Sequence, residues 1–278
     1  MTVNNYHVNA GNGVRLFCTS WQPPSSAKAV LFIVHGLGEH SGRYEEMAEA
    51  LVQKGIASFA FDHRGHGKSG GKRGHAQSIE QLIEDTEFAL MKCRSLFLDI
   101  PIFMMGHSMG GQIVATFINK AKSKEISGAI ISSAWFRLIS PPTSWQIKMI
   151  YFLKSIAPNI CLSNQLDSGH ISSVKEEVEV YEKDELIHDK ISFALFKSLY
   201  NNGIEIAEKK SALNIPVLVC HGDLDKITSS TASSLYAKNL EGDTSFVIWH
   251  GSYHEPHHDH EKDKVIQFYA DWILEKLS

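Results

Sequence analysis

The stretch that decides the fold of this chain is Ile102-Phe103-Met104-Met105-Gly106-His107-Ser108-Met109-Gly110-Gly111. Its apolar first part predicts a short buried strand, and the apolar spacing that follows Gly111 predicts a helix. Between the two, Gly106, Ser108 and Gly110 form the pattern of a serine nucleophile on a sharp strand-to-helix turn. The same pattern also arises by chance in glycine-bearing turns, but the flanking strand and helix favour a nucleophile at Ser108.

The surrounding sequence repeats this alternation of short apolar runs and longer amphipathic segments. Such alternation is typical of an α/β protein with a mainly parallel central sheet and helices on both faces. We expect an N-terminal hairpin of residues 6–9 and 14–21, then buried strands at 30–34, 57–61, 102–105, 129–132, 217–220 and 246–249. Apolar residues have helical spacing at 44–54, 79–96, 112–122, 231–239 and 264–276.

One long gap interrupts the alternation. Between Ala134 and Asn214, about eighty residues lack a convincing buried strand, far more than a usual crossover contains. We therefore expect an inserted helical cap at residues 135–207, on a core formed by residues 1–134 and 208–278.

Composition limits the functions that this chain can have. The 278 residues are 43% hydrophobic and 21% charged, as in ordinary globular proteins, and the formal net charge of −4 gives no overall cationic field for nucleic acid. The polar start of the chain shows no apolar signal segment, so we expect a cytoplasmic protein. The most apolar stretch, 145–162, is interrupted by Lys148, Lys154 and Pro158, so we expect no membrane-spanning helix.

A serine nucleophile needs a base to take its proton and an acid to orient that base. Asp223 and Asp225 follow the predicted strand 217–220, and His254 follows the predicted strand 246–249. Many aspartates in such loops are plain turn residues. However, these two lie beyond the carboxyl end of a strand, where ligands bind in open α/β sheets. We predict Asp225, in preference to Asp223, as the acid, and His254 as the base.

The loop after the predicted strand 30–34 reads His35-Gly36-Leu37-Gly38-Glu39-His40. In this kind of site, a loop at that position supplies the second backbone donor of the oxyanion hole. We predict the backbone N–H groups of Leu37 and Met109 as these donors. The alternative is a glycine turn with unrelated histidines. We disfavour it because this loop and the loop of Ser108 leave adjacent strands at the same edge of the predicted sheet.

Three other motifs suggest a cofactor or a metal, and each fails in its context. The glycines of residues 65–70 match G-x-G-x-x-G but lead into more loop instead of a helix. A Walker loop ending at Ser69 needs glycine where Asp62 stands. Residues 254–258 satisfy H-E-x-x-H, but Pro256 disfavours the helix that zinc ligation requires. We therefore expect neither a cofactor nor a metal.

With these motifs in place, the chain resembles the monoacylglycerol lipase branch of the α/β-hydrolase superfamily, also described as lysophospholipase-like or serine aminopeptidase S33 hydrolases. The matching blocks are His35–Tyr44, Asp62–Ser69, Gly106–Gly111, Gly222–Asp225 and Gly251–His254. The resemblance implies Ser108 as nucleophile, Asp225 as acid and His254 as base, with backbone donors at Leu37 and Met109. It also implies that the cap is a lid that admits an acyl chain and often touches membranes.

The expected activity is a serine esterase that cleaves monoacylglycerols to fatty acid and glycerol through an acyl-enzyme on Ser108. A lysophospholipase or short-chain carboxylesterase is the enzymatic alternative, and a non-catalytic lipid-binding member of the fold is the alternative of another class. The expected partner is a small acyl ester. The oligomeric state stays open.

Contact between the cap and a membrane depends on how an apolar segment of the cap packs. Its apolar residues exceed what one amphipathic helix needs for docking: Trp145, Ile147, Met149, Ile150, Tyr151, Phe152, Leu153 and Ile156. Either all of them pack inward over the site, as in most apolar helical stripes, or part of them faces outward. An outward part, with Lys148 and Lys154, would allow peripheral contact with lipid.

Overall fold

The computed structural model describes residues 1–120 and 125–277, so the last two residues of the expected helix 112–122, and Ser278, lie outside the described part. An eight-stranded sheet runs through the chain in the order β1-β2-β4-β3-β5-β6-β10-β12. The strands are β1 (Thr2–Asn9), β2 (Arg15–Gln22), β3 (Ala29–Val34), β4 (Ile56–Phe61), β5 (Ile102–His107), β6 (Gly128–Ser132), β10 (Val217–Gly222) and β12 (Thr244–Trp249).

The sheet is parallel from β4 to β12, and β2 pairs antiparallel with both β1 and β4. Every residue of β3, β4 and β5 is buried, because helices cover both faces and these strands are apolar runs. The prediction of an α/β fold with a mainly parallel sheet is confirmed.

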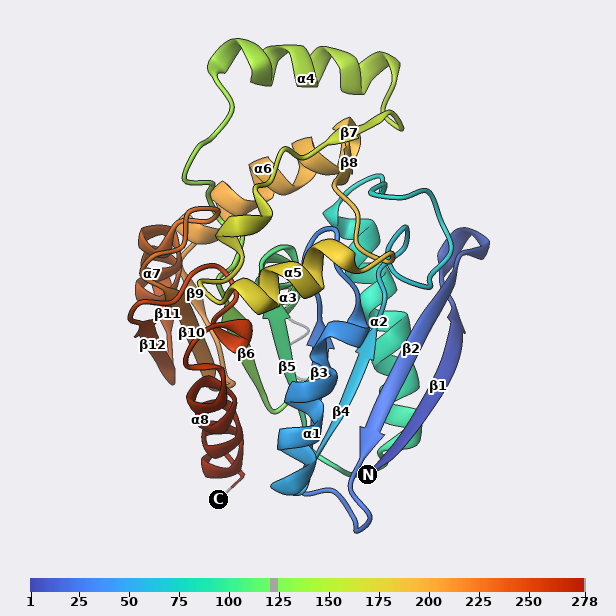
Figure 1. Cartoon of the computed structure of the whole chain (residues 1–278), viewed down its shortest axis with the longest axis vertical. Coiled ribbons are helices and arrows are strands. Elements are labelled where there is room, and N and C mark those ends of the chain that lie inside the picture. Colours follow the sequence, from blue (N-terminus) through green and yellow to red (C-terminus); the bar gives the residue numbers. More distant parts are fainter. Residues whose placement is uncertain (121–124, 278) are drawn as a thin grey trace.

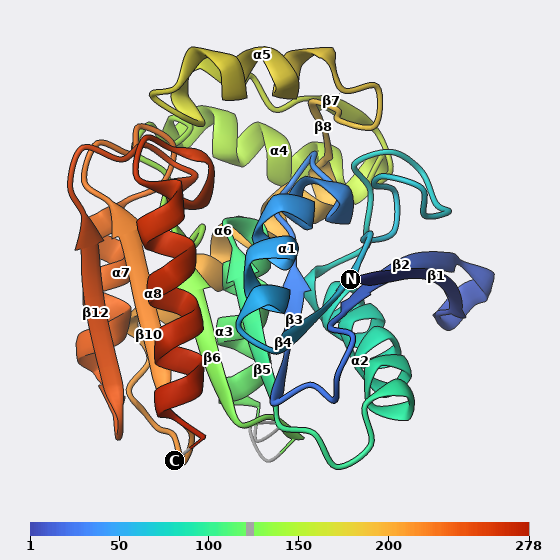
Figure 2. The same cartoon turned by 60° about the horizontal axis from the view of Figure 1, so that its bottom comes forward.

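Two hydrophobic clusters lie on opposite faces of the sheet. On one face, α1 (Glu45–Gln53) and α8 (Lys262–Glu275) pack against alternate residues such as Leu31 and Ile33. On the other face, the intervening residues of the strands, such as Phe32 and Val34, pack with α2 (Ile79–Leu96), α3 (Met109–Asn119) and α7 (Ser230–Asn239). Figures 1 and 2 show these helices around the twisted sheet.

The N-terminal hairpin is longer than the sequence pattern predicts. Pairing of β1 with β2 runs from Thr2 opposite Gln22 to Asn9 opposite Arg15, with a 3-10 turn at Gly11–Gly13 between them. Three of the four extra residues at the start of β1 are polar, so they show no apolar alternation. Backbone hydrogen bonds to β2 hold them in the strand, and such bonds do not depend on the side-chain sequence.

The segment between β6 and β10 rises beyond the carboxyl ends of the parallel strands (Figure 1). Its elements are α4 (Ser144–Ile156), β7 (Cys161–Ser163), α5 (Lys175–Lys183), β8 (Lys190–Ser192), α6 (Phe193–Glu208) and β9 (Ser211–Ala212), and β9 pairs with β11 (Leu240–Glu241). Helix α6 contacts α4 above it and also α2, α3 and α7 of the core. Across residues 1–120 and 125–277, no helix has the length and apolar content needed to cross a bilayer.

Candidate active site

Ser108 stands on the sharp turn between β5 and α3. Its backbone has φ 53° and ψ −116°, in the positive-φ region that non-glycine residues rarely adopt. A Cβ atom at Gly106 would clash with the backbone of Gly110, and one at Gly110 would clash with the carbonyl of Val34. The two glycines therefore let β3, β5 and α3 approach closely enough to hold the strained serine.

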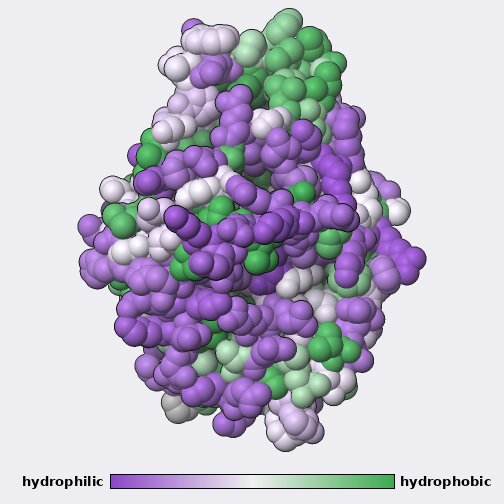
Figure 3. Space-filling view, in the orientation of Figure 1, coloured by the Kyte–Doolittle hydropathy of each residue, from purple (hydrophilic) through white to green (hydrophobic). Residues whose placement is uncertain are grey.

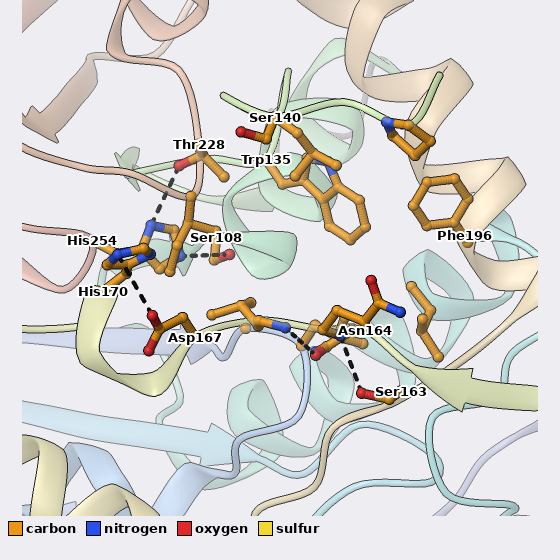
Figure 4. Close-up of a pocket in the computed structure, with 18 of the residues that line it drawn as sticks. Ser108, Trp135, Ser140, Ser163, Asn164, Asp167, His170, Phe196, Thr228 and His254 are labelled. Carbon is orange, nitrogen blue, oxygen red and sulfur yellow. Dashed lines mark hydrogen bonds and ion pairs between the residues drawn. The ribbon is translucent and has the colours of Figure 1, made fainter. Parts of the chain in front are cut away.

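A chain of hydrogen bonds joins Ser108 to His254 and Asp225. His254 Nε2 lies 3.0 Å from Ser108 Oγ, and His254 Nδ1 lies 2.7 Å from Asp225 Oδ2. Figure 4 shows the bond between Ser108 and His254. A carboxylate only accepts hydrogen bonds, so Nδ1 carries the proton and Nε2 of the neutral ring is free to accept from the serine hydroxyl.

Asp225 is fixed by several further donors. Its Oδ1 accepts from the backbone N–H groups of Ile227 at 2.7 Å and Thr228 at 3.0 Å. Its Oδ2 accepts from the Thr228 hydroxyl at 2.9 Å and lies 3.0 Å from His221 Nε2. The sequence patterns gave no role to His221 or Thr228, although both lie within four residues of Asp225.

Asp223 has a different set of partners. Its carboxylate accepts the backbone N–H of Gly251 at 2.7 Å and lies 2.8 Å from His250 Nδ1. The structure therefore brings Asp225, and not Asp223, to His254. Asp223 instead joins the loop that carries Asp225 to the loop that carries His254.

Burial and charge shift the pKa values of His254 and Asp225 in opposite directions. Burial lowers the pKa of His254, but the charge and hydrogen bond of Asp225 outweigh burial and raise this pKa above the ordinary 6.5. Burial raises the pKa of Asp225, yet the charge of His254 and the bonds from His221 and His254 hold it well below its usual range. The pair therefore favours a carboxylate beside an imidazole that readily takes a proton.

The predicted oxyanion donors lie around Ser108. Met109 is the first residue of α3, so its N–H has no acceptor within the helix, and Leu37 lines the same cavity as Ser108. Glu39 fixes the Leu37 loop, because its Oε1 accepts the backbone N–H of Gly36 at 2.5 Å and the hydroxyl of Tyr44 at 3.0 Å.

A buried guanidinium links this loop to the histidine loop. Arg43 donates to both carboxylate oxygens of Glu255 at 2.7 Å and to Glu39 Oε2 at 2.9 Å. Burial raises the pKa of Glu255, but Arg43 outweighs it and lowers this pKa well below the usual range. The sequence patterns gave Arg43 and Glu255 no role. Arg43 stands in the block His35–Tyr44 and Glu255 in the H-E-x-x-H run, but neither pattern pointed to a contact between them.

The same contacts account for the H-E-x-x-H run. Glu255 bonds Arg43 and His258, His254 bonds Asp225 and Ser108, and Pro256–His258 forms a 3-10 helix. Among residues 1–120 and 125–277, no three His, Cys, Asp or Glu side chains are grouped so that they could hold a metal ion.

A cavity of about 560 Å³ opens above Ser108 and His254, between the core and the segment that carries α4. Much of its wall is apolar: Leu37, Trp135, Leu138, Met149, Ile150, Leu153, Ile191, Phe193 and Phe196. The loop after β7 adds the polar side chains of Asn164, Gln165, Asp167 and His170. Figure 4 shows Trp135 and Phe196 facing the cavity, with Asn164, Asp167 and His170 on another side of it.

Comparison with known proteins identifies the family. The family model "Serine aminopeptidase, S33" matches residues 25–261. This chain is a member of the serine aminopeptidase S33 family.

Individual proteins also resemble most of this chain. The monoacylglycerol lipase of Mycolicibacterium smegmatis is 30% identical over 98% of this chain and 97% of that protein. An uncharacterised abhydrolase domain-containing protein of Dictyostelium discoideum is 31% identical over 93% of this chain, which spans only 27% of that protein. The crystal structure of Paleococcus ferrophilus monoacylglycerol lipase has a TM-score of 0.85 and 31% identity, covering 94% of this chain and 99% of that one. The fold is therefore the α/β-hydrolase fold.

The first prediction separates the two aspartates of the S33 site. Asp225→Asn should lower kcat by about 10⁴-fold, because the amide no longer fixes the His254 tautomer or stabilises the imidazolium. Asp223→Asn should lower kcat by less than about tenfold, because it weakens only a loop contact. Hydrolysis of a p-nitrophenyl ester measures both. An equal or reversed effect of the two variants would contradict the assignment of Asp225.

The second prediction concerns pH. Because protonated His254 cannot accept a proton from Ser108, kcat/KM should fall as the pH drops through the pKa of His254. The raised pKa places the midpoint of this fall above 6.5. A pH profile of ester hydrolysis by the wild type, measured with the protein shown to stay folded, gives the midpoint. A midpoint at or below 6.5 would contradict the conclusion that Asp225 outweighs burial at His254.

Proposed function

We propose that this chain hydrolyses the ester bond of monoacylglycerols to fatty acid and glycerol, through an acyl-enzyme on Ser108. One observation carries the proposal: the hydrogen-bonded series Ser108, His254 and Asp225 lies beneath a largely apolar cavity of about 560 Å³. A non-catalytic lipid-binding role would not require this series. The similarity to monoacylglycerol lipases supports the same substrate class.

In the proposed reaction, Ser108 Oγ attacks the ester carbonyl while His254 Nε2 takes the hydroxyl proton. The oxyanion of the tetrahedral intermediate accepts hydrogen bonds from the N–H groups of Leu37 and Met109, and Asp225 stabilises the imidazolium. His254 then gives its proton to the departing glycerol oxygen, which leaves an acyl ester on Ser108. A water molecule, deprotonated by His254, attacks this ester, so the fatty acid departs and Ser108 recovers its proton.

The charges around the cavity favour glycerol over a phosphate head group. Phosphate is usually bound by clustered Arg or Lys side chains. Among the described lining residues, Lys226 is the one Lys or Arg side chain, and its ammonium lies 5.1 Å from the Tyr253 ring. Three carboxylates also line the cavity, Glu39, Asp167 and Glu255, and Arg43 pairs with the first and the third. The cavity therefore offers no cluster of free cations for a phosphate, whereas a neutral polyol can donate hydrogen bonds to side chains such as Asp167.

The cap assignment, residues 135–207, also belongs to this proposal. Side chains of α4 such as Ile150 and Leu153 line the cavity, so this segment can cover an acyl chain as a lid. An adjacent side of α4 is apolar and exposed, because Trp145, Phe152 and Ile156 are 63%, 65% and 64% exposed. Figure 3 shows hydrophobic surface gathered at the end of the molecule that α4 forms. We infer that this outward face contacts lipid surfaces, where a long-chain substrate resides.

The third prediction tests the proposed chemistry. A fluorophosphonate probe should label Ser108 of the wild type, and the enzyme should cleave a long-chain monoacylglycerol with a higher kcat/KM than the matching lysophospholipid. Ser108→Ala should fold normally and lose labelling and nearly all activity on every ester. The double variant Ser108→Ala/His254→Ala should be little worse than either single variant, because the two residues act as a unit.

The outcomes separate the alternatives. If Ser108 is labelled but the lysophospholipid is cleaved with the higher kcat/KM, the mechanism holds and the substrate is a lysophospholipid. A folded wild type with neither labelling nor hydrolysis would support a lipid-binding role. Multiplying losses in the double variant would contradict a shared mechanism.

The fourth prediction tests the outward face of α4. Anionic vesicles should increase the rate on a long-chain monoacylglycerol, and Lys148→Glu/Lys154→Glu should remove this increase, because the new carboxylates are repelled by anionic lipid. Hydrolysis of a soluble short-chain ester should stay unchanged.

A matched control has the same change in net charge outside α4, Lys209→Glu/Lys210→Glu, on two exposed lysines. It should keep the vesicle effect. Vesicle-independent rates of the wild type, or equal losses in both double variants, would show that α4 does not bind lipid through this face.

A further inference from the structure

Strand β1 forms one edge of the eight-stranded sheet. It pairs along its full length with β2, and no strand of the described residues lies along its other side. Figures 1 and 2 show the β1–β2 hairpin at the rim of the molecule, where it projects past the neighbouring helix α2. An exposed edge of this length can pair with another strand unless the sequence prevents it.

The contacts of β2 establish which backbone groups of β1 point outward. Asp62 donates its N–H to Phe17 O at 2.8 Å, so Phe17 faces β4 and its neighbours Leu16 and Cys18 face β1. The even-numbered residues of β1 pair with the even-numbered residues of β2, from Val8 opposite Leu16 to Thr2 opposite Gln22. The N–H and C=O groups of the odd-numbered residues therefore point away from the sheet, and these are Val3, Asn5, His7 and Asn9.

No group within residues 1–120 and 125–277 hydrogen-bonds to these outward backbone groups. Edge strands usually avoid pairing through charged side chains, proline, bulges or short length. Strand β1, Thr-Val-Asn-Asn-Tyr-His-Val-Asn, has eight residues with no Lys, Arg, Asp, Glu or Pro, and its register with β2 is continuous. None of these four protections applies to it.

We propose that β1 is a dimerisation edge, on which β1 of a second copy of this chain adds antiparallel about a two-fold axis. In the register centred on Tyr6, Val3 lies opposite the second copy's Asn9, and Asn5 lies opposite its His7. All four outward residues then pair, which gives about eight hydrogen bonds between the chains. The two sheets become one continuous sheet across the axis.

The strand itself favours a second copy as its occupant. A two-fold axis places the same surface on both partners, so the edge must complement itself. Strand β1 meets this condition because it has no charged residue to oppose its copy, and Asn5 can hydrogen-bond the imidazole of His7 across the axis. Both Asn5 and His7 are exposed in the single chain.

Two pairs of substitutions test both the edge and the register. Asn5→Lys/His7→Lys places like charges opposite each other across the axis, so it should abolish the dimer. Asn5→Lys/His7→Glu places opposite charges together at the same positions, so it should keep the dimer. Gln77→Lys/Ser245→Lys adds the same charge as the first pair at exposed positions outside β1, and it should leave the dimer unchanged.

Sedimentation velocity from about 1 µM to about 1 mM measures the assembly, and hydrolysis of a short-chain ester shows that each variant folds. Amide exchange of Asn5 and His7 should slow as the wild type dimerises. The proposal is overturned if the wild type stays monomeric throughout, if the lysine pair dimerises as the wild type does, or if these two amides stay unprotected in the dimer. Loss of the dimer in the charge-complementary pair would overturn the register.

Discussion

Parallel pairing of neighbouring strands is the constraint on which the site depends. Val34 lies beside Gly106, His107 beside Ser132, and Gly222 beside Trp249. Because parallel strands end at the same edge, four loops, the first and last more than two hundred residues apart, meet there. Each loop supplies one component of the site, and none of them could assemble it alone.

Buried charge then fixes the loops to one another. Arg43 and Glu255 are both almost fully buried, and a guanidinium or carboxylate in such surroundings is costly unless it is paired. Their two parallel hydrogen bonds, together with the bond to Glu39, offset this cost only when the oxyanion loop and the histidine loop are in place. The same network that stabilises the charges therefore preorganises the donors around Ser108 before substrate binds.

The sequence predicted the parts of the structure that local patterns encode. Buried strands are apolar runs, and the serine turn needs glycines at fixed offsets, so both could be located, as could two aspartates and one histidine beyond strand ends. The contact of Arg43 with Glu255 could not be predicted, because these residues are 212 positions apart and neither has a local signature. The early half of β1 was missed because its mostly polar side chains show no strand pattern, although backbone hydrogen bonds to β2 hold it in the sheet.

Helix α4 has one apolar side that lines the cavity and another that is exposed. Ile150 and Leu153 face the cavity, whereas Trp145, Phe152 and Ile156 recur on another side of the helix at intervals of seven and four residues. A helix apolar on two sides keeps one of them in water unless something covers it, at a cost of about 25 cal/mol for each Å² of apolar surface. In the proposed function, the outer set would contact lipid while Ile150 and Leu153 shape the site for the acyl chain. Substitutions in the outer set would then change lipid contact without changing the residues that line the cavity.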